Sequence, residues 1–148
     1  MDKLKQKYQK ITQALITLKK AVEIFTIFIK EGKSYNPHMN YDEEYRGLRD
    51  SMIQRFEYCV DLFWKYLKKD LEMKNLAPTI KAPSEVIRKC LTIGIITENE
   101  AENILSMVKE RNKTSHIYIE EIAEELAKKI PDYYQLMHCI TQRINPEN

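Results

Sequence analysis

The sequence predicts an all-α fold, an antiparallel up-and-down four-helix bundle with one additional short helix. Apolar residues recur every three or four positions along most of the chain, which is the helical period. Only 3 glycines and 5 prolines stand among the 148 residues, too few for a β fold rich in tight turns. That length suits one hydrophobic core, so we expect a single domain over residues 1–148.

The first predicted helix begins near residue 4. Its apolar residues have near-heptad spacing, which also leaves apolar surface for a partner and favours a homodimer. Gly32 follows as a C-terminal stop, and residues 33–41, which contain Asn36 and Pro37, are expected to form a loop. The residues that define the apolar face are Leu4, Tyr8, Ile11, Leu15, Leu18, Val22, Phe25 and Ile29.

A second long helix is expected to end before a connector at residues 74–82, which contains Pro78. Pro83 is well placed to begin a short helix that runs to about Ile93, and Gly94 ends it. The apolar face of the long helix is formed by Leu48, Met52, Phe56, Cys59 or Val60, Phe63, Leu67 and Leu71.

The next helix carries a clear start signal. Thr97 and Glu100 have the spacing of a capping box, in which each side chain accepts a hydrogen bond from the other residue's backbone N–H. The last helix is predicted to carry on its inward face the apolar residues Ile119, Ile122, Leu126, Ile130, Tyr133, Met137, Ile140 and Ile144. Pro131 lies within it, so we expect a kink or a short break there.

Composition excludes several classes of protein. A formal net charge of +2 is too small to indicate nucleic-acid binding by itself, so an RNA ligand would need a local patch such as Lys109, Arg111 and Lys113. The alternative is that both lysines are ordinary solvated residues near a helix C-terminus. No apolar run is as long as a membrane span, and the charged N-terminus does not resemble a signal peptide. We therefore expect a cytoplasmic protein.

The chain shows no pattern typical of a metal or cofactor site. Cys59, Cys90 and Cys139 are too far apart for a zinc site, and their apolar neighbours predict reduced core residues. His38 and His138 have no partners at metal-ligand spacing. There is no glycine-rich phosphate loop and no paired-aspartate motif of a nucleotidyltransferase. We predict neither metal nor cofactor.

The segment from Arg111 to Tyr118 is the strongest functional signal. Arg111 continues the apolar stripe of Ile104 and Val108, and an inward-leaning arginine is costly unless it is paired. His116 follows Thr114 and Ser115, two natural N-cap residues, which predicts a place in the first turn of the last helix. Arginine stabilises phosphate charge and histidine moves protons, so together they suit metal-independent phosphodiester chemistry. Taken singly, an arginine at a frayed helix end and a packed histidine at a helix junction would explain both residues.

The order R-x4-H-x-Y from Arg111 through His116 to Tyr118 resembles the signature of the HEPN superfamily, and Asn112 fits the small polar residue that follows the arginine. Within it, the chain looks like the nucleotidyltransferase substrate-binding proteins and HepT-type toxins encoded beside minimal nucleotidyltransferases. Residues 55–65 resemble that family's second-helix block and residues 83–88 its short-helix block.

The resemblance implies specific roles. Arg111 and His116 would be catalytic, Asn112 would orient them or bind phosphate, and Tyr118 would accept a nucleotidyl group that silences the nuclease. Residues 55–61 would support the cleft, although Arg55, Glu57 and Asp61 also suit ordinary solvated or paired positions. The partners implied are a second copy of the chain, a cognate nucleotidyltransferase and RNA.

Three hypotheses follow. The first is an endoribonuclease toxin of a two-gene toxin–antitoxin module. The second is a non-catalytic substrate-binding subunit of a nucleotidyltransferase. The third is a helical dimerisation module without chemistry, which predicts a buried, ion-paired Arg111 and a His116 that faces no cleft.

Overall fold

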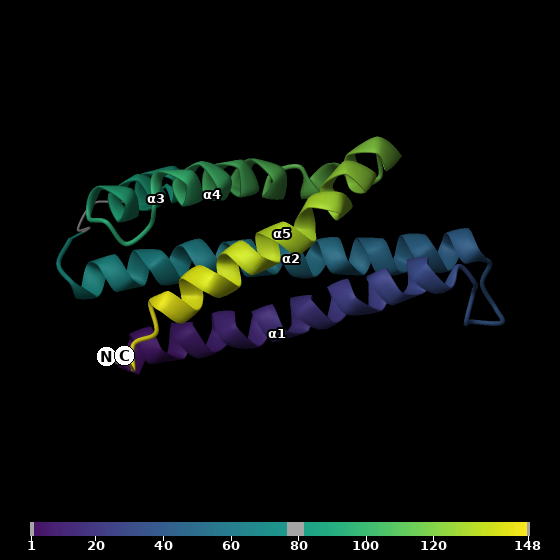
Figure 1. Cartoon of the computed structure of the whole chain (residues 1–148), viewed down its shortest axis with the longest axis horizontal. Helices are drawn as coiled ribbons and strands as arrows, with labels where there is room; N and C mark the ends of the chain where they lie inside the picture. The colour runs from purple at the N-terminus through teal and green to yellow at the C-terminus, as the bar shows by residue number, and fades with distance from the viewer. Residues whose placement is uncertain (1, 77–81, 148) are drawn as a thin grey trace.

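The computed structural model describes residues 2–76 and 82–147 and confirms the all-helical prediction. The connector around Pro78 lies outside these residues. The elements are α1 (Asp2–Glu31), α2 (Tyr41–Met73), α3 (Pro83–Thr92), α4 (Glu98–Arg111), the short 3₁₀ helix η1 (Thr114–His116) and α5 (Glu120–Arg143) (Figure 1).

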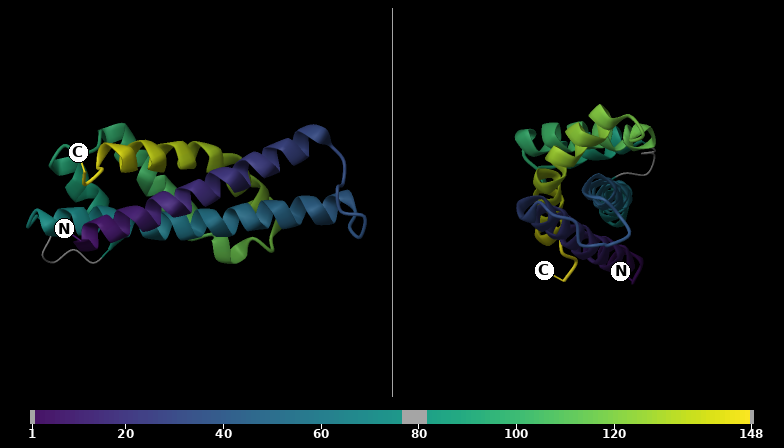
Figure 2. Two further views of the ribbon diagram at one scale, coloured as in Figure 1. Left: turned by 90° about the horizontal axis from the view of Figure 1, so that it is seen from below. Right: turned by 90° about the vertical axis from the view of Figure 1, so that its right-hand side faces the viewer.

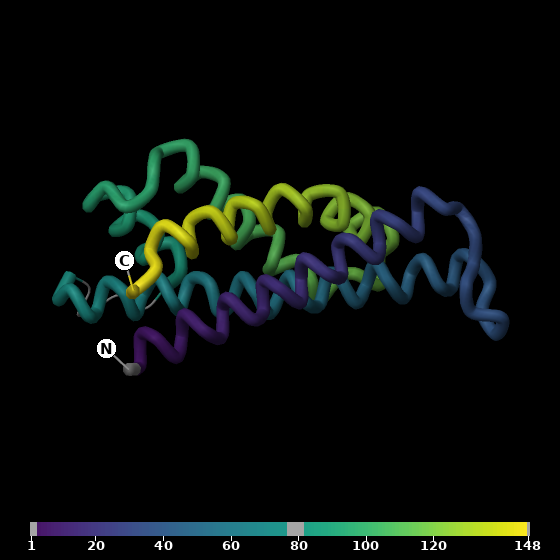
Figure 3. Tube along the Cα trace, turned by 60° about the horizontal axis from the view of Figure 1, so that its bottom comes forward, coloured from purple at the N-terminus to yellow at the C-terminus, as the bar shows by residue number. Residues whose placement is uncertain are grey.

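The four longer helices, α1, α2, α4 and α5, form the bundle, and α3 is the additional short helix. α1 and α2 run antiparallel and pack along most of their length, and α5 packs on both (Figure 1). α3 and α4 lie on α2, and α4 also meets α5, as the end view of Figure 2 shows. The loop between α1 and α2 is at one end of the molecule, and both termini are at the other (Figure 3).

The predicted signals at three helix ends are confirmed. Gly32 and Gly94 have φ of 66° and 83°, a left-handed conformation that glycine adopts without the steric cost of a Cβ. Thr97 and Glu100 form the predicted capping box at α4, with N···O distances of 2.9 and 3.1 Å. Asn40 and Glu43 form a second box at α2. These local bonds fix where the helices begin and end.

Two local predictions are corrected. Of the kink or short break expected at Pro131, the break is absent, because α5 continues through this residue. Buried residues on both sides of it, Ile130 and Tyr134, hold that stretch of the helix against the core, and this packing compensates for the missing N–H. Cys59 and Cys90 are buried as predicted, but Cys139 is exposed because α5 turns that position towards solvent.

Burial sets the chemistry of the two inner thiols. It raises the pKa of Cys59 to about 12 and that of Cys90 to about 11, so both stay protonated and unreactive. None of the described helices is both long enough and apolar enough to cross a membrane.

Candidate functional site

Arg111 ends α4 and reaches across to α2. Its Nε donates to Asp61 Oδ1 at 2.8 Å and its Nη2 to Asp61 Oδ2 at 2.9 Å, which is a side-on bidentate pair. Nη2 also lies 3.4 Å from Glu57 Oε1. The hydrogen bonds to Asp61 outweigh desolvation and raise the pKa of Arg111, so the guanidinium is held as a fixed cation.

One edge of this guanidinium is unused. Among the described residues, Nη1 of Arg111 has no hydrogen-bond partner, and it is not among the buried polar atoms that lack one. The side chain is 26% exposed. Two N–H groups of a positioned cation therefore face solvent, where they are free to bind an anion.

η1 holds the segment after Arg111 against α2. The buried Thr114 hydroxyl donates to Glu57 Oε2 at 2.6 Å, and the Arg111 carbonyl oxygen lies 2.9 Å from the same hydroxyl. Glu57 thus contacts both Arg111 and Thr114, and it fixes the turn that carries His116.

The expected helical setting of His116 is wrong. His116 ends η1, and α5 begins four residues later at Glu120, with Ile119 as its N-cap and no side-chain cap bond. Thr114 does not cap α5 because its hydroxyl is bound to Glu57 on α2. The partial positive charge at the start of α5 therefore does not act on His116 directly.

His116, Tyr118 and Asn112 all project into solvent. Neither imidazole nitrogen of His116 has a hydrogen-bond partner among the described residues, and the ring meets Tyr118 edge-on with centroids 6.0 Å apart. Tyr118 is 77% exposed. Asn112 is the C-cap of α4 and binds through its backbone N–H, which leaves its side chain free.

Five of the best-defined cavities over the described residues are lined by other side chains, and neither Arg111 nor His116 borders any of them. Arg111 ends α4 and His116 ends η1, so both residues lie at the junction between α4 and α5. Within residues 2–76 and 82–147, no three His, Cys, Asp or Glu side chains are grouped to hold a metal ion.

No partner of Arg111 was predicted, although the sequence contains a signal for one. Glu57 and Asp61 are four residues apart, which puts two carboxylates on one face of a helix. An arginine on an inward stripe needs such a partner. The sequence did not show which helix would present its acidic face to α4.

The comparisons with known proteins agree on a family and a fold. The family model described as "Nucleotidyltransferase substrate binding protein like" matches residues 6–146. A crystal structure from Thermus thermophilus is 31% identical, with a TM-score of 0.72, and the match covers 91% of this chain and 98% of that one. No curated protein matches the chain.

Two more distant structures share the fold. A Haemophilus influenzae protein, described as having the fold of a substrate binding domain of a nucleotidyltransferase, is 20% identical with a TM-score of 0.76. The match covers 92% of this chain and 97% of that one. A chain of a toxin–antitoxin crystal structure with AMP-PNP is 13% identical with a TM-score of 0.64, over 91% of this chain and 97% of that one.

Proposed function

Because the chain belongs to the family of nucleotidyltransferase substrate binding protein-like domains, we propose that it is the partner of a minimal nucleotidyltransferase in a toxin–antitoxin module. Within that module it acts as a metal-independent endoribonuclease whose working groups are Arg111 and His116. The observation that carries this proposal is the solvent-facing Nη1 edge of an otherwise anchored arginine, five residues before an exposed histidine with no partner among the described residues.

The chemistry needs one proton carrier and one fixed cation. An RNA 2′-oxygen attacks the adjacent phosphorus, the bond to the 5′-oxygen breaks, and a cyclic phosphate and a 5′-hydroxyl result. His116 removes the 2′ proton or delivers one to the leaving oxygen. Arg111 binds the charge that builds up on the phosphoryl oxygens, and Asn112 positions the phosphate.

One chain supplies one histidine to this reaction, whereas the reaction moves a proton at two oxygens. A two-fold dimer that brings two motifs together supplies both an acid and a base. The open setting of His116, outside the five cavities, fits a site that a second copy completes.

The test compares histidine variants of similar exposure. His116→Ala is expected to lower cleavage of single-stranded RNA by at least about a hundredfold, the usual contribution of acid–base catalysis, and Arg111→Ala by a similar factor. His38→Ala, which alters an exposed loop histidine, should cleave normally. Full cleavage by a folded, pure His116→Ala protein would refute the mechanism.

The second candidate function is that of a non-catalytic substrate-binding subunit, and the 77% exposure of Tyr118 favours it. Its hydroxyl is open to a nucleotidyl-transferring partner. Co-expression with the cognate nucleotidyltransferase and intact-mass measurement would then show a gain of one or more nucleotidyl units. Tyr118→Phe should abolish the gain, and Tyr35→Phe, at another exposed loop position, should not.

These measurements also separate the remaining alternatives. A mass gain with no cleavage by the unmodified protein selects the binding subunit. Cleavage that the modification suppresses unites both functions in one protein. If the protein shows no cleavage and no mass gain, the dimerisation module is selected. That hypothesis predicted a buried Arg111, whereas the side chain is 26% exposed.

A further inference from the structure

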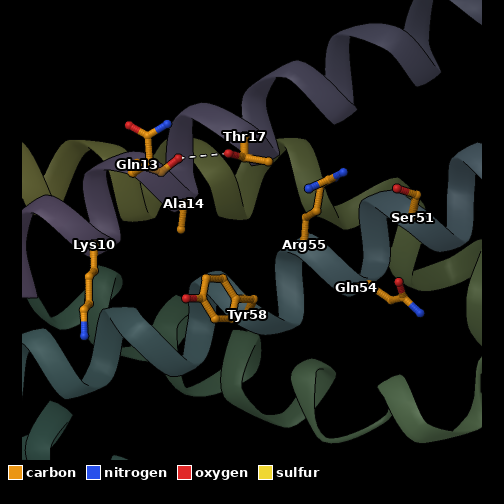
Figure 4. A pocket seen from close by; sticks show the side chains of 8 residues that line it. All are labelled: Lys10, Gln13, Ala14, Thr17, Ser51, Gln54, Arg55 and Tyr58. Atoms are coloured by element: carbon orange, nitrogen blue, oxygen red, sulfur yellow. Dashed lines mark hydrogen bonds between the residues drawn. The ribbon is translucent and has the colours of Figure 1, made fainter.

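A groove between α1 and α2 lies outside the motif and has no assigned role. It encloses about 520 Å³, its floor includes the buried Ala14, and Lys10, Thr17, Ser51, Arg55 and Tyr58 are among its walls (Figure 4). A second hollow of about 290 Å³ shares Thr17, Ser51 and Arg55 with it and extends it to Lys20 and Ile24. The two hollows form one track, which we call the α1–α2 groove.

All the charged side chains that line the groove are positive. Lys10, Lys20 and Arg55 border it, and no aspartate or glutamate does. None of these three side chains forms an ion pair with the described residues. By contrast, Arg49 on α2 pairs with Glu120 and Arg111 on α4 pairs with Asp61. Three unpaired cations over an acid-free groove attract an anion such as phosphate.

The groove also presents an aromatic ring. Tyr58 is 59% exposed, and its ring pairs with no other aromatic ring among the described residues. In Figure 4 the ring lies between Lys10, which reaches down from α1, and Arg55, which reaches up from α2. An open aromatic face between cations is the arrangement that binds unpaired bases and their phosphates.

We propose that the α1–α2 groove binds single-stranded RNA, with Tyr58 stacking on a base and Lys10 and Arg55 holding the flanking phosphates. This proposal deepens the proposed function and rests on it for the identity of the substrate. Tyr58 directly follows Glu57, which contacts Arg111 and Thr114, so the groove and the motif occupy adjacent faces of α2.

The length of the groove favours a strand over a free nucleotide. From Lys10 to Ile24 the groove follows 14 residue steps of α1, which is about 20 Å at the helical rise. That span is long enough for several consecutive nucleotides. The cations at Lys10, Arg55 and Lys20 are spread along it instead of converging on one phosphate.

A second copy of the chain fits the groove less well. A two-fold interface places the same patch on both sides. Lys10, Lys20 and Arg55 would then face their own counterparts without a carboxylate to offset them, which is unfavourable.

The experiment measures binding without cleavage. A labelled 2′-O-methyl oligonucleotide lacks the free hydroxyl that the reaction needs, so the wild-type chain can be titrated by fluorescence anisotropy. Tyr58→Leu is expected to weaken binding about tenfold through lost stacking. Arg55→Gln should lower the slope of log affinity against log salt by about 0.7, as for one phosphate contact. Tyr35→Leu and Arg88→Gln, exposed positions away from the groove, are the matched controls.

The outcomes are separable. Unchanged affinity in folded Tyr58→Leu and Arg55→Gln proteins overturns the groove proposal, as does a change in oligomeric state with affinity retained. Adenosine monophosphate binding as tightly as the oligonucleotide overturns the assignment to a strand. Cleavage of unmodified RNA is measured separately. If the wild-type chain binds RNA normally but does not cleave it, the nuclease proposal is rejected and the groove proposal stands. If the wild-type chain cleaves RNA and the groove variants bind it normally, the groove proposal is rejected and the nuclease proposal stands.

Discussion

Arg49 and Arg111 each join two helices, and they differ in how many guanidinium donors remain without a hydrogen-bond partner. Arg49 is 1% exposed, and all three guanidinium nitrogens donate: Nη1 and Nη2 to Glu120 on α5 at 2.8 and 3.1 Å, and Nε to Asp50 at 3.0 Å. Arg111 uses Nε and Nη2 and keeps Nη1 open to solvent. The fold uses every guanidinium nitrogen of Arg49, whereas it holds Arg111 in place and leaves its Nη1 available to a ligand.

The difference shows how to distinguish a structural arginine from a candidate functional one. Both side chains have a raised pKa caused first by hydrogen bonds to a carboxylate, so the direction of the shift does not separate them. The number of unused donors and the exposure of the guanidinium do. Arg143 combines features of both: its two terminal nitrogens bind Glu100 at 2.8 Å, as in Arg49, but its side chain is 41% exposed.

The largest expected effect is on stability at Arg49. Arg49→Met keeps the buried stem but removes three charge-assisted hydrogen bonds of a 1% exposed guanidinium, and we expect it to lower the free energy of unfolding by about 2 kcal/mol while water solvates Glu120, which is 52% exposed. Arg111→Met should cost less than about 1 kcal/mol, because Asp61 and Glu57 are 36% and 38% exposed and water solvates them once the arginine is gone. Urea unfolding with unchanged m-values measures both. Equal costs at the two positions would make Arg111 structural.

An intermediate effect is expected at Glu100 as pH falls. The Arg143 guanidinium lowers the pKa of Glu100 to about 2, below its ordinary value of about 4.5. The pair therefore stabilises the fold fully above about pH 4.5, and this contribution is lost as pH falls towards 2. Because solvent screens the pair, we expect it to contribute about 1–2 kcal/mol to the free energy of unfolding at neutral pH.

Glu100→Gln should remove this part of the acid sensitivity. Its stability is expected to be lower than that of the wild type at pH 7 and nearly equal at pH 2, as measured by urea midpoints at each pH. Glu125→Gln, at an exposed position on α5, is the control. A constant difference between wild type and Glu100→Gln from pH 7 to pH 2 would contradict the assignment.

The smallest expected effect is at Glu57. Glu57→Gln keeps an oxygen that accepts the Thr114 hydroxyl, so stability should fall by less than about 1 kcal/mol. The change removes one of two carboxylates beside Arg111, and RNA affinity should rise about twofold at low salt because less negative charge opposes the phosphate. Anisotropy with the 2′-O-methyl oligonucleotide measures this. A fall in affinity would mean that Glu57 matters mainly by positioning Arg111.

The sequence was most informative where the interactions are local. The glycine stops at Gly32 and Gly94 and the capping box at Thr97 each involve residues within about four positions, and all three were correctly predicted. The same local rule failed at Thr114, which looked like the cap of α5. Its hydroxyl bonds instead to Glu57, 57 residues earlier, and the last helix begins later than expected.

By itself the sequence determined the helices, most of their ends, the apolar faces that meet in the core, and the place of Arg111 and His116 at a junction between helices. Helical periodicity and capping act within one or two turns, so they can be read along the chain. Only the tertiary structure decided that Arg111 pairs with Asp61, that Arg49 is buried against Glu120, and that Lys10, Arg55 and Tyr58 face one groove. Those contacts depend on how helices dozens of residues apart in sequence pack together, and helical periodicity does not specify their relative placement.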